Sequence, residues 1–280
     1  MSNQNDEDKR IKKYKQTVEK QFQETIGKKI NWEFPTTYNE KLQVLKVRES
    51  TDELWKFADK AQVREFVEAT IGKEYLVPFI ALYDKADDID FDSLPNSFVL
   101  KATHGSNWNI ICDNKKLLDK DDTIKRCNEW LSLNYCDDFG IERQYRKIKP
   151  RIICEANISK DNCLPIDYKF FCFKGAPKFI QVDLGRATNH VRDYYDLDWN
   201  ILPFGNEYPR SGQKTDKPSN LSEMIEIVQK LCKDFEHVRV DLYFQNQKIY
   251  FGELTFTPQN GMGRFDPPEY DEIIGSYLSV

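Results

Sequence analysis

The sequence lacks the closely spaced cysteines and histidines that build disulfide frameworks or zinc sites. Its seven cysteines are an odd number, none of them forms a Cys-x-x-Cys pair, and only three histidines accompany them. Both kinds of site need closely spaced, paired ligands. We therefore expect neither, and predict that the cysteines are small buried side chains. They are Cys112, Cys127, Cys136, Cys154, Cys163, Cys172 and Cys232.

Long apolar runs are also missing. No stretch approaches the roughly 20 apolar residues that a membrane-spanning helix needs. The first ten residues, MSNQNDEDKR, are polar and lack the apolar segment of a signal peptide. These absences predict a cytoplasmic protein with at most peripheral membrane contact.

Charge of one sign is nearly balanced by charge of the other. The 280 residues include 41 Lys or Arg and 46 Asp or Glu, for a net charge of −5. The basic residues do not gather with aromatic residues in one segment, which argues against nucleic-acid binding. With 40% hydrophobic residues the chain has enough apolar material for a large core.

The N-terminal part of the chain is rich in helical patterns. Apolar residues recur every three or four positions over residues 1–30 and again over 54–71, where Gly72 follows as a stop. Residues 75–83 and 97–102 read as strands, and 119–133 as a helix with an Asp as N-cap.

Short strands dominate after residue 151. We expect them at 152–156, 168–173, 178–182 and 191–195, then a helix over 221–235 and two final strands, 238–244 and 248–255. The pattern predicts an α+β fold with a mostly antiparallel C-terminal sheet.

The last two strands carry a candidate metal site. A hairpin turn centred on Asn246 would place Arg239 opposite Glu253 and Asp241 opposite Phe251, all on one face. Asp241 and Glu253 would then be diagonal neighbours, close enough to share Mg²⁺. A plain Arg239–Glu253 ion pair on a solvated face is the alternative.

Two further segments suit an anionic nucleotide. Lys101 precedes a turn that contains Gly105 and Ser106, where backbone N–H groups and a lysine suit a phosphate. Residues 151–158 and 167–169 are compatible with successive contacts to adenine, ribose and phosphates. A surface lysine before a glycine turn, and a hairpin with exposed charges, remain the alternatives.

These motifs together resemble the TupA-like branch of the ATP-grasp superfamily, in their order and spacing from about Asp59 to Arg264. The matching positions are Asp59-Lys60, Arg64, Gly72, Leu76, Pro78, residues 98–106, Glu155, residues 167–169, residues 195–199 with Asp196 and Asp198, residues 239–241 and residues 251–258.

The resemblance implies an ATP-grasp fold in which two α+β lobes hold ATP and Mg²⁺. It suggests an N-terminal helical region over 1–96, a small lobe over 97–155, and a large lobe with the metal site over 156–280. By resemblance, ATP-binding residues are Lys101, Gly105, Ser106, Glu155, Ala156, Asn157, Ile158, Asp167 and Lys169.

The resemblance also assigns catalytic and metal roles. Lys101 reaches the phosphates, Arg239 faces the transferred phosphoryl group, and His104 is either a general base or a residue that orients the loop. Asp241 and Glu253 resemble the magnesium ligands. Thr255 occupies the position where the superfamily usually has Asn, and Thr257 or a water are alternatives. The loop reads Gly-Ser-Asn, where a second glycine is expected near Asn107.

Such proteins activate a carboxylate as an acyl phosphate, which an amine then attacks. The resemblance suggests a ligase that joins an amino acid or other amine to a uronic-acid sugar of a capsular or other cell-surface polysaccharide. Candidate acceptor contacts are His104, Arg186, Arg192 and the basic residues of 143–151, although an ordinary solvated strand end is the favoured interpretation of that last stretch.

Other functions remain open from the sequence. Asp88-x-Asp90 and Asp196-x-Asp198 each match the short metal-diphosphate pattern of nucleotide-sugar glycosyltransferases. A kinase acting on a sugar or lipid would share the ATP chemistry. A glycan-binding protein without catalytic activity is the third alternative.

Overall fold

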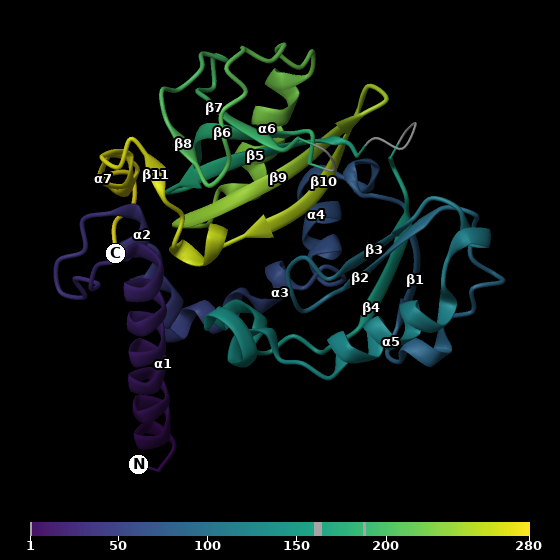
Figure 1. Cartoon of the computed structure of the whole chain (residues 1–280), viewed down its shortest axis with the longest axis horizontal. Coiled ribbons are helices and arrows are strands. Elements are labelled where there is room, and N and C mark those ends of the chain that lie inside the picture. The colour runs from purple at the N-terminus through teal and green to yellow at the C-terminus, as the bar shows by residue number, and fades with distance from the viewer. Residues whose placement is uncertain (1, 160–163, 187–188) are drawn as a thin grey trace.

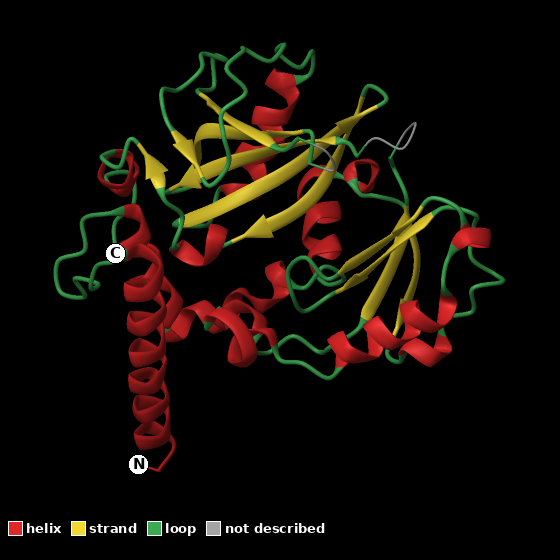
Figure 2. Cartoon of the chain, viewed as in Figure 1, coloured by secondary structure: helices red, strands yellow, loops and turns green. Residues whose placement is uncertain are grey.

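The computed structural model describes residues 2–159, 164–186 and 189–280. Two β-sheets form separate lobes, and N-terminal helices lie beside the larger one (Figures 1 and 2). Among the described residues, no helix has the length and apolar character needed to cross a membrane. The six described cysteines are buried, as predicted, whereas Cys163 lies outside the described residues.

The N-terminal helix α1 (Ser2–Ile26) has one buried stripe, because its apolar residues recur at helical spacing. Val18 and Phe22 pack against Val47 and Met262, which come from distant parts of the chain. The N-terminal end of α1 projects away from the rest of the molecule (Figure 1). Helix α2 (Tyr38–Val47) follows, started by a capping box between Thr37 and Glu40.

The single helix expected over residues 54–71 is wrong. The structure has α3 (Trp55–Ala58) and α4 (Val63–Ile71), separated at Asp59, whose backbone is extended. Asp59 Oδ1 accepts hydrogen bonds from the N–H groups of Ala61 and Gln62, at 2.8 and 3.2 Å. An aspartate that bonds to the backbone in this way competes with helix continuation. The break leaves Lys60 in a turn between the lobes.

The smaller sheet has four strands in the order β1-β4-β2-β3, all antiparallel. They are β1 (Phe79–Tyr83), β2 (Phe98–Ala102), β3 (Asn109–Cys112) and β4 (Ile152–Ala156). Helix α5 (Lys120–Leu131), capped by Asp119 as expected, buries Cys127 and Trp130 against it. Strand β4 therefore pairs with β2 and with β1, and not with the C-terminal strands that follow it in the chain.

The larger sheet has five strands in the order β10-β9-β5-β6-β7, antiparallel as predicted. They are β5 (Ile166–Phe173), β6 (Ala176–Leu184), β7 (Val191–Tyr195), β9 (His237–Gln245) and β10 (Lys248–Thr255). One face packs on α6 (Leu221–Cys232) and α4 through residues such as Phe170, Val240 and Val228. The opposite face is apolar only at one end, around Tyr38, Phe171 and Phe179.

The hairpin register differs from the expectation. A bulge at Gly252 shifts the pairing, so that Glu253 lies directly opposite Asp241 and Thr255 lies opposite Arg239. Phe251 lies opposite Leu242 and is buried in the core instead of facing the polar side. An extra residue in one strand re-phases the side chains that follow it. The bulge thus turns both Glu253 and Thr255 toward the polar face.

Short elements complete the chain. They are η1 (Glu49–Leu54), η2 (Lys73–Tyr75), η3 (Ala86–Asp88), η4 (Lys115–Leu117), η5 (Cys136–Gly140), η6 (Arg143–Tyr145), β8 (Gly205–Asn206), η7 (Pro258–Gly261), β11 (Phe265–Asp266) and α7 (Tyr270–Gly275).

Candidate active site between the two sheets

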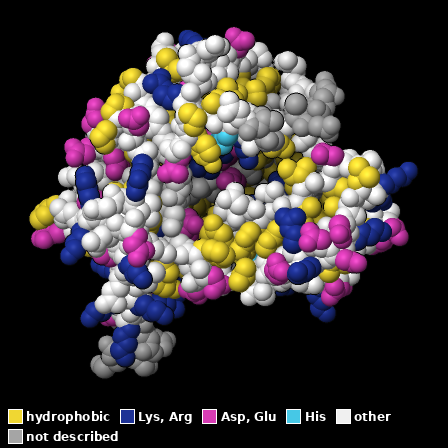
Figure 3. Space-filling view, viewed as in Figure 1, with side chains coloured by type: hydrophobic (Ala, Val, Ile, Leu, Met, Phe, Trp, Pro, Cys, Tyr) yellow, Lys and Arg dark blue, Asp and Glu magenta, His cyan; other side chains and the backbone are white. Residues whose placement is uncertain are grey.

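A cavity of about 630 Å³ opens over the polar face of the larger sheet. Figure 3 shows a hollow near the middle of the molecule, with basic and acidic side chains in its depth. Six basic and six acidic side chains line it among the described residues. They are Lys60, Lys101, Lys169, Arg186, Arg192 and Arg239, and Glu142, Asp167, Asp183, Glu207, Asp241 and Glu253.

The hairpin β9–β10 supplies the centre of the cavity wall. Arg239 Nε and Nη2 donate to the two oxygens of Asp241, each at 2.7 Å. Nη2 also lies 3.0 Å from Thr255 Oγ1 and 3.4 Å from Glu253 Oε1. The hydroxyl of Thr255 donates to Glu253 over 3.0 Å. The structure therefore brings Arg239, Asp241, Glu253 and Thr255 together.

Strand β5 extends this charged cluster across the sheet. Lys169 Nζ lies 2.8 Å from Asp241 Oδ2 and 2.5 Å from Asp167 Oδ2. Arg186 Nη1 donates to the same oxygen of Asp167 at 2.8 Å. Asp167 Oδ1 is buried beside the cavity and has no hydrogen-bond partner. A buried acceptor without a partner fits a ligand hydroxyl, such as that of a ribose.

Glu253 is held in its charged form. Burial by itself raises the pKa of this carboxyl, but the positive charges of Lys60, Arg239 and Lys169 and the hydrogen bond from Thr255 together outweigh burial, and its pKa falls to about 2. An ionised carboxylate beside Asp241 is the kind of hard oxygen ligand that Mg²⁺ prefers.

The donor set at this place fits Mg²⁺ shared with phosphates. No three Asp, Glu, His or Cys side chains form a metal cluster within the described ranges. Two carboxylates plus a threonine hydroxyl are still sufficient, because Mg²⁺ keeps waters and takes further oxygens from a bound phosphate. Asp241, Glu253 and Thr255 would hold it. Thr257 also lines the cavity, but its hydroxyl donates to the buried Glu142 and accepts from Gln144 at 2.8 Å.

A slot of about 110 Å³ lies beside the cavity and shares Lys101 and Tyr243 with it. Ala156, Asn157 and Ile158 line it together with apolar residues of both lobes. A lining rich in apolar side chains fits a purine base.

Glu155, predicted to contact the nucleotide, turns its side chain away from this slot. Its carboxylate pairs with Arg64 at 2.6 Å and with Lys101 at 2.8 Å. Successive side chains of β4 point to opposite faces of the sheet. That of Glu155 faces the gap between α4 and β10, whereas the residues that follow it border the slot. Glu155 therefore positions Lys101.

The loop after β2 lies at the mouth of the cavity. Ser106 lines the cavity, whereas Gly105 packs so closely against Trp108 and Tyr135 that a Cβ would lie within 2.8 Å of both rings. Asn107 has φ 61°, a left-handed conformation that asparagine tolerates better than most residues. This explains why a second glycine is not required here.

Lys60 is a cavity residue to which sequence reasoning assigned no role. Its Nζ lies 2.5 Å from Gly105 O, and burial lowers its pKa. The helix break at Asp59 brings it there. The Asp59-Lys60 motif was the only signal for it in the sequence.

His104 does not enter the cavity. Its ring is buried, with Nε2 2.8 Å from Trp130 O and the Trp108 ring at 5.2 Å. This geometry fits a residue that orients the loop.

The other candidate substrate contacts lie partly inside and partly outside the cavity. The described lining of the cavity includes Arg186 and Arg192 but not the basic residues of 143–151. That stretch pairs with acids elsewhere, as in Arg143–Asp52 and Lys147–Glu53. Asp88, Asp90, Asp196 and Asp198 lie outside the cavity, and Asp196 accepts from the N–H groups of its own turn.

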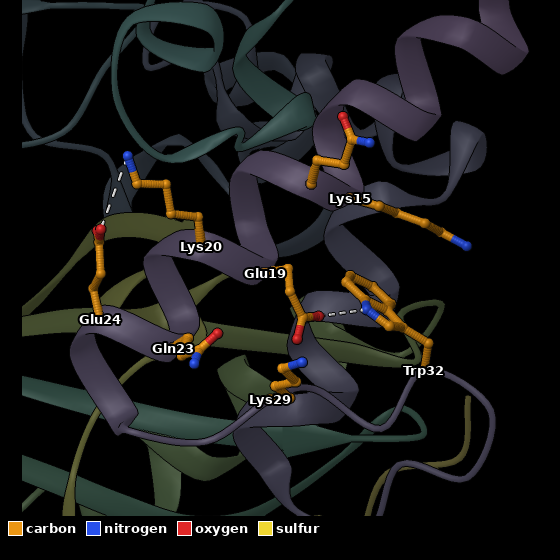
Figure 4. A pocket seen from close by; sticks show the side chains of 8 residues that line it. Lys15, Glu19, Lys20, Gln23, Glu24, Lys29 and Trp32 are labelled. Atoms are coloured by element: carbon orange, nitrogen blue, oxygen red, sulfur yellow. Dashed lines mark hydrogen bonds and ion pairs between the residues drawn. The ribbon is translucent and has the colours of Figure 1, made fainter.

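A second hollow lies against α1 (Figure 4). Glu19 accepts hydrogen bonds there from Trp32 Nε1 at 2.7 Å and from Ile30 N at 3.2 Å. These contacts fasten the following loop to the helix. Lys20 and Glu24 form a loose and exposed ion pair at 3.9 Å.

The family of the chain follows from its sequence match. The model of the TupA-like ATPgrasp family matches residues 40–279. The chain therefore belongs to the TupA-like ATP-grasp family, and its two lobes form an ATP-grasp fold. No curated protein sequence matches it.

Several solved structures share similarity with the chain. D-alanine–D-alanine ligase from Bacillus anthracis is 16% identical over 71% of this chain and 57% of its own, with a TM-score of 0.43. The Helicobacter pylori enzyme is 14% identical over 85% and 62%, with a TM-score of 0.47. Phosphoribosylamine–glycine ligase from Thermotoga maritima is 11% identical over 75% and 51%, with a TM-score of 0.43. The chain thus spans roughly half to two thirds of these proteins.

Proposed function

We infer that the protein is an ATP-dependent carboxylate–amine ligase. In such a reaction a substrate carboxylate oxygen attacks the terminal phosphorus and ADP leaves. The amine nitrogen then attacks the acyl carbon of the acyl phosphate, loses a proton and displaces phosphate. The substrate we favour is a uronic-acid sugar of a cell-surface polysaccharide, and the amine is an amino acid or a related compound.

The observation that carries this proposal is the set of ion pairs between carboxylates and basic side chains within the cavity. Asp241 is bonded to Arg239 and Lys169, the residues expected to bind phosphate oxygens. Mg²⁺ bound to Asp241 and Glu253 would neutralise charge on the phosphates. Arg239 and Lys169, which lie beside these carboxylates, would donate to oxygens of the phosphoryl group in a preorganised site.

The first test is thermal stabilisation by a non-hydrolysable ATP analogue, with and without Mg²⁺, beside UDP-sugars. A ligand at one hundred times its Kd adds about 2.7 kcal/mol to the free energy of unfolding. We expect a large rise in the unfolding temperature only when the analogue and Mg²⁺ are present together. The analogue alone would draw Arg239 away from Asp241, and Mg²⁺ alone would draw Asp241 away from Arg239. In either case one of the two residues would lack its counter-charge.

ADP release in the presence of uronic acids and amines then tests the reaction. Turnover that needs both a carboxylate and an amine supports the ligase. Stabilisation by UDP-sugars alone would overturn it in favour of a glycosyltransferase.

A further inference from the structure

One wall of the cavity lies outside the residues assigned to ATP and Mg²⁺. It consists of Tyr135 just before η5, Glu142 just before η6, and Tyr145 at the end of η6. We call these three residues the η6 wall. Glu142 and Tyr145 are each only 7% exposed. A carboxylate therefore lines the cavity at a place where little water reaches it.

Glu142 differs from the other acids of the cavity in its partners. Four of the six acids form ion pairs of 2.5 to 3.4 Å with a lysine or arginine. They are Asp167, Asp183, Asp241 and Glu253. Within the described ranges, Glu142 and Glu207 have no such pair. Glu207 is exposed, so water solvates its charge. Glu142 is buried, and a buried carboxylate without a counter-charge is costly.

The hydrogen bonds of Glu142 come from uncharged groups and involve one oxygen. Oε1 accepts from the Thr257 hydroxyl and, at 3.4 Å, from Gln144 Nε2. Gln144 Nε2 also donates to Thr257 Oγ1 at 2.8 Å, which fixes the three side chains together. Oε2 forms no hydrogen bond with the part of the chain that the structure describes. The carboxylate is thus held in position with one oxygen available to a ligand.

Lys46 compensates the charge of Glu142 only in part. It is fully buried, and its Nζ donates to Asn260 O at 3.2 Å, without an ion pair to Glu142 among the described residues. Burial raises the pKa of the Glu142 carboxyl, and Lys46 and two hydrogen bonds lower it without restoring the usual value. The charge of Glu253 raises this pKa too, so the η6 wall lies within electrostatic reach of the proposed metal site.

The two tyrosines place aromatic rings beside this carboxylate. The ring centroids of Tyr135 and Tyr145 lie 4.9 Å apart. Burial raises the pKa of both hydroxyls, and the charge of Glu142 raises it further, which shows that all three residues are close neighbours. Aromatic faces attract organic cations, and a carboxylate supplies the opposite charge. The η6 wall therefore has the features of a site for a singly charged cation.

We propose that the η6 wall binds the ammonium group of the amine substrate, with Glu142 as its counter-charge. The ammonium completes the ion pair that Glu142 lacks and packs against the tyrosine rings. Because Mg²⁺ prefers oxygen ligands and the tyrosines offer ring faces, an organic ammonium fits this wall better than a metal ion. The proposal rests on the proposed function for one point, that the bound cation is the amine that reacts.

NMR titration of the full chain with small probes tests this, with and without saturating Mg²⁺ and ATP analogue. The probes are propylammonium, propan-1-ol and propionate, which are similar in size and differ in charge. We expect propylammonium to bind more tightly than the other two. Glu142→Gln keeps an oxygen for Thr257 and should weaken propylammonium binding at least about tenfold, the equivalent of one hydrogen bond to a charged group.

Two variants serve as controls. Glu207→Gln removes an exposed acid of the same cavity and should bind propylammonium like the wild type. Glu142→Asp keeps the charge and should bind it more tightly than Glu142→Gln does. A further measurement needs no variant: intermolecular nuclear Overhauser effects from propylammonium should reach the ring protons of Tyr135 and Tyr145.

The outcomes separate the two proposals. Weaker propylammonium binding in Glu142→Gln, with nucleotide stabilisation retained, supports the ammonium site. Equal binding of all three probes, unchanged affinity in Glu142→Gln, or Overhauser effects only to other residues would overturn it and leave the ligase proposal standing. Propylammonium binding that appears only after Mg²⁺ is removed would assign Glu142 to a metal ion and overturn it too. A chain that binds propylammonium at the η6 wall but no nucleotide would overturn the ligase proposal alone.

Discussion

At the residue scale, Glu253 is the sharpest test of the metal site. Glu253→Gln keeps an oxygen for Arg239 and Thr255, so the fold should persist. The neutral amide is a poor Mg²⁺ ligand. We expect the Mg²⁺-dependent thermal shift with the ATP analogue to disappear and ADP release to fall at least about 100-fold.

Glu226→Gln, on the exposed side of α6, is the matched control and should behave like the wild type. Undiminished turnover in Glu253→Gln would exclude this carboxylate as a metal ligand.

His237 predicts how stability depends on pH. Its Nδ1 donates to Phe256 O at 3.1 Å and its Nε2 accepts from the Tyr38 hydroxyl at 3.0 Å, an arrangement that only the neutral ring satisfies. Burial lowers its pKa from 6.5 to about 3. The unfolded chain therefore binds the proton more tightly, so this contribution is complete above pH 6.5 and is lost as the pH falls toward 3.

Denaturant unfolding of His237→Gln checks this. We expect the variant to be less stable than the wild type at pH 7, and this difference in unfolding free energy should shrink by about 2 kcal/mol at pH 5. The reason is that below pH 6.5 the unfolded wild-type chain gains a proton on His237, which favours unfolding, and the variant has no such group. A deficit that is equal at both values would mean that His237 titrates normally in the folded protein.

At the scale of elements, the β9–β10 bulge sets the geometry of the site. A Cβ at Gly252 would lie 3.0 Å from Asp241 O and 3.2 Å from the Tyr243 ring. Gly252→Ala should therefore push β10 away from β9 by a few tenths of an ångström, at a cost of about 1 kcal/mol. We expect affinity for the Mg²⁺–nucleotide analogue to fall more than stability does.

Gly205→Ala in β8 is the comparison, since its Cβ would meet no atom closer than 3.4 Å. If both variants bind the analogue like the wild type, the close approach at Gly252 is not what aligns Glu253 with Asp241.

Much of the fold and part of the site could be predicted from the sequence, because their signals are local. Most strands and helices have the periodicity expected, and Arg239, Asp241, Glu253 and Thr255 share one hairpin. The register was wrong although a signal existed: the buried residues Ile249, Phe251, Leu254 and Phe256 break strict alternation between 251 and 254.

What could not be predicted depends on contacts between distant segments. The pairing of β4 with β1 and β2 joins residues 50 to 76 positions apart. Lys60 reaches the loop at Gly105, and Tyr208 meets His190, only once the tertiary structure forms. No periodicity or spacing encodes such contacts in a single sequence.

At the scale of the whole molecule, α1 belongs to the same folded unit as the segments beside the cavity, although the family match begins at residue 40. Phe22 is 2% exposed and packs in a cluster with Ile141 and Met262, which flank the segments that carry Glu142 and Thr257. Phe22→Ala should cost about 3–5 kcal/mol of unfolding free energy in a single transition.

Phe34→Ala, at a nearby residue that is 68% exposed, should stay within about 0.5 kcal/mol of the wild type. A Phe22→Ala protein with unchanged stability, or one that unfolds in two steps, would show that α1 folds apart from the rest.

The bulge at Gly252 also has a consequence for chain length in this family. At the bulge, β10 has one residue more than its partner β9. Deletion of Gly252 alone would therefore leave a regular strand on which Glu253 and Thr255 still face the cavity. Loss of Leu254 would instead exchange Thr255 for Phe256 at the site. Relatives should therefore tolerate changes in length at the turn and the loss of Gly252, but between Glu253 and Thr255 they should keep Leu254 and gain residues only in pairs.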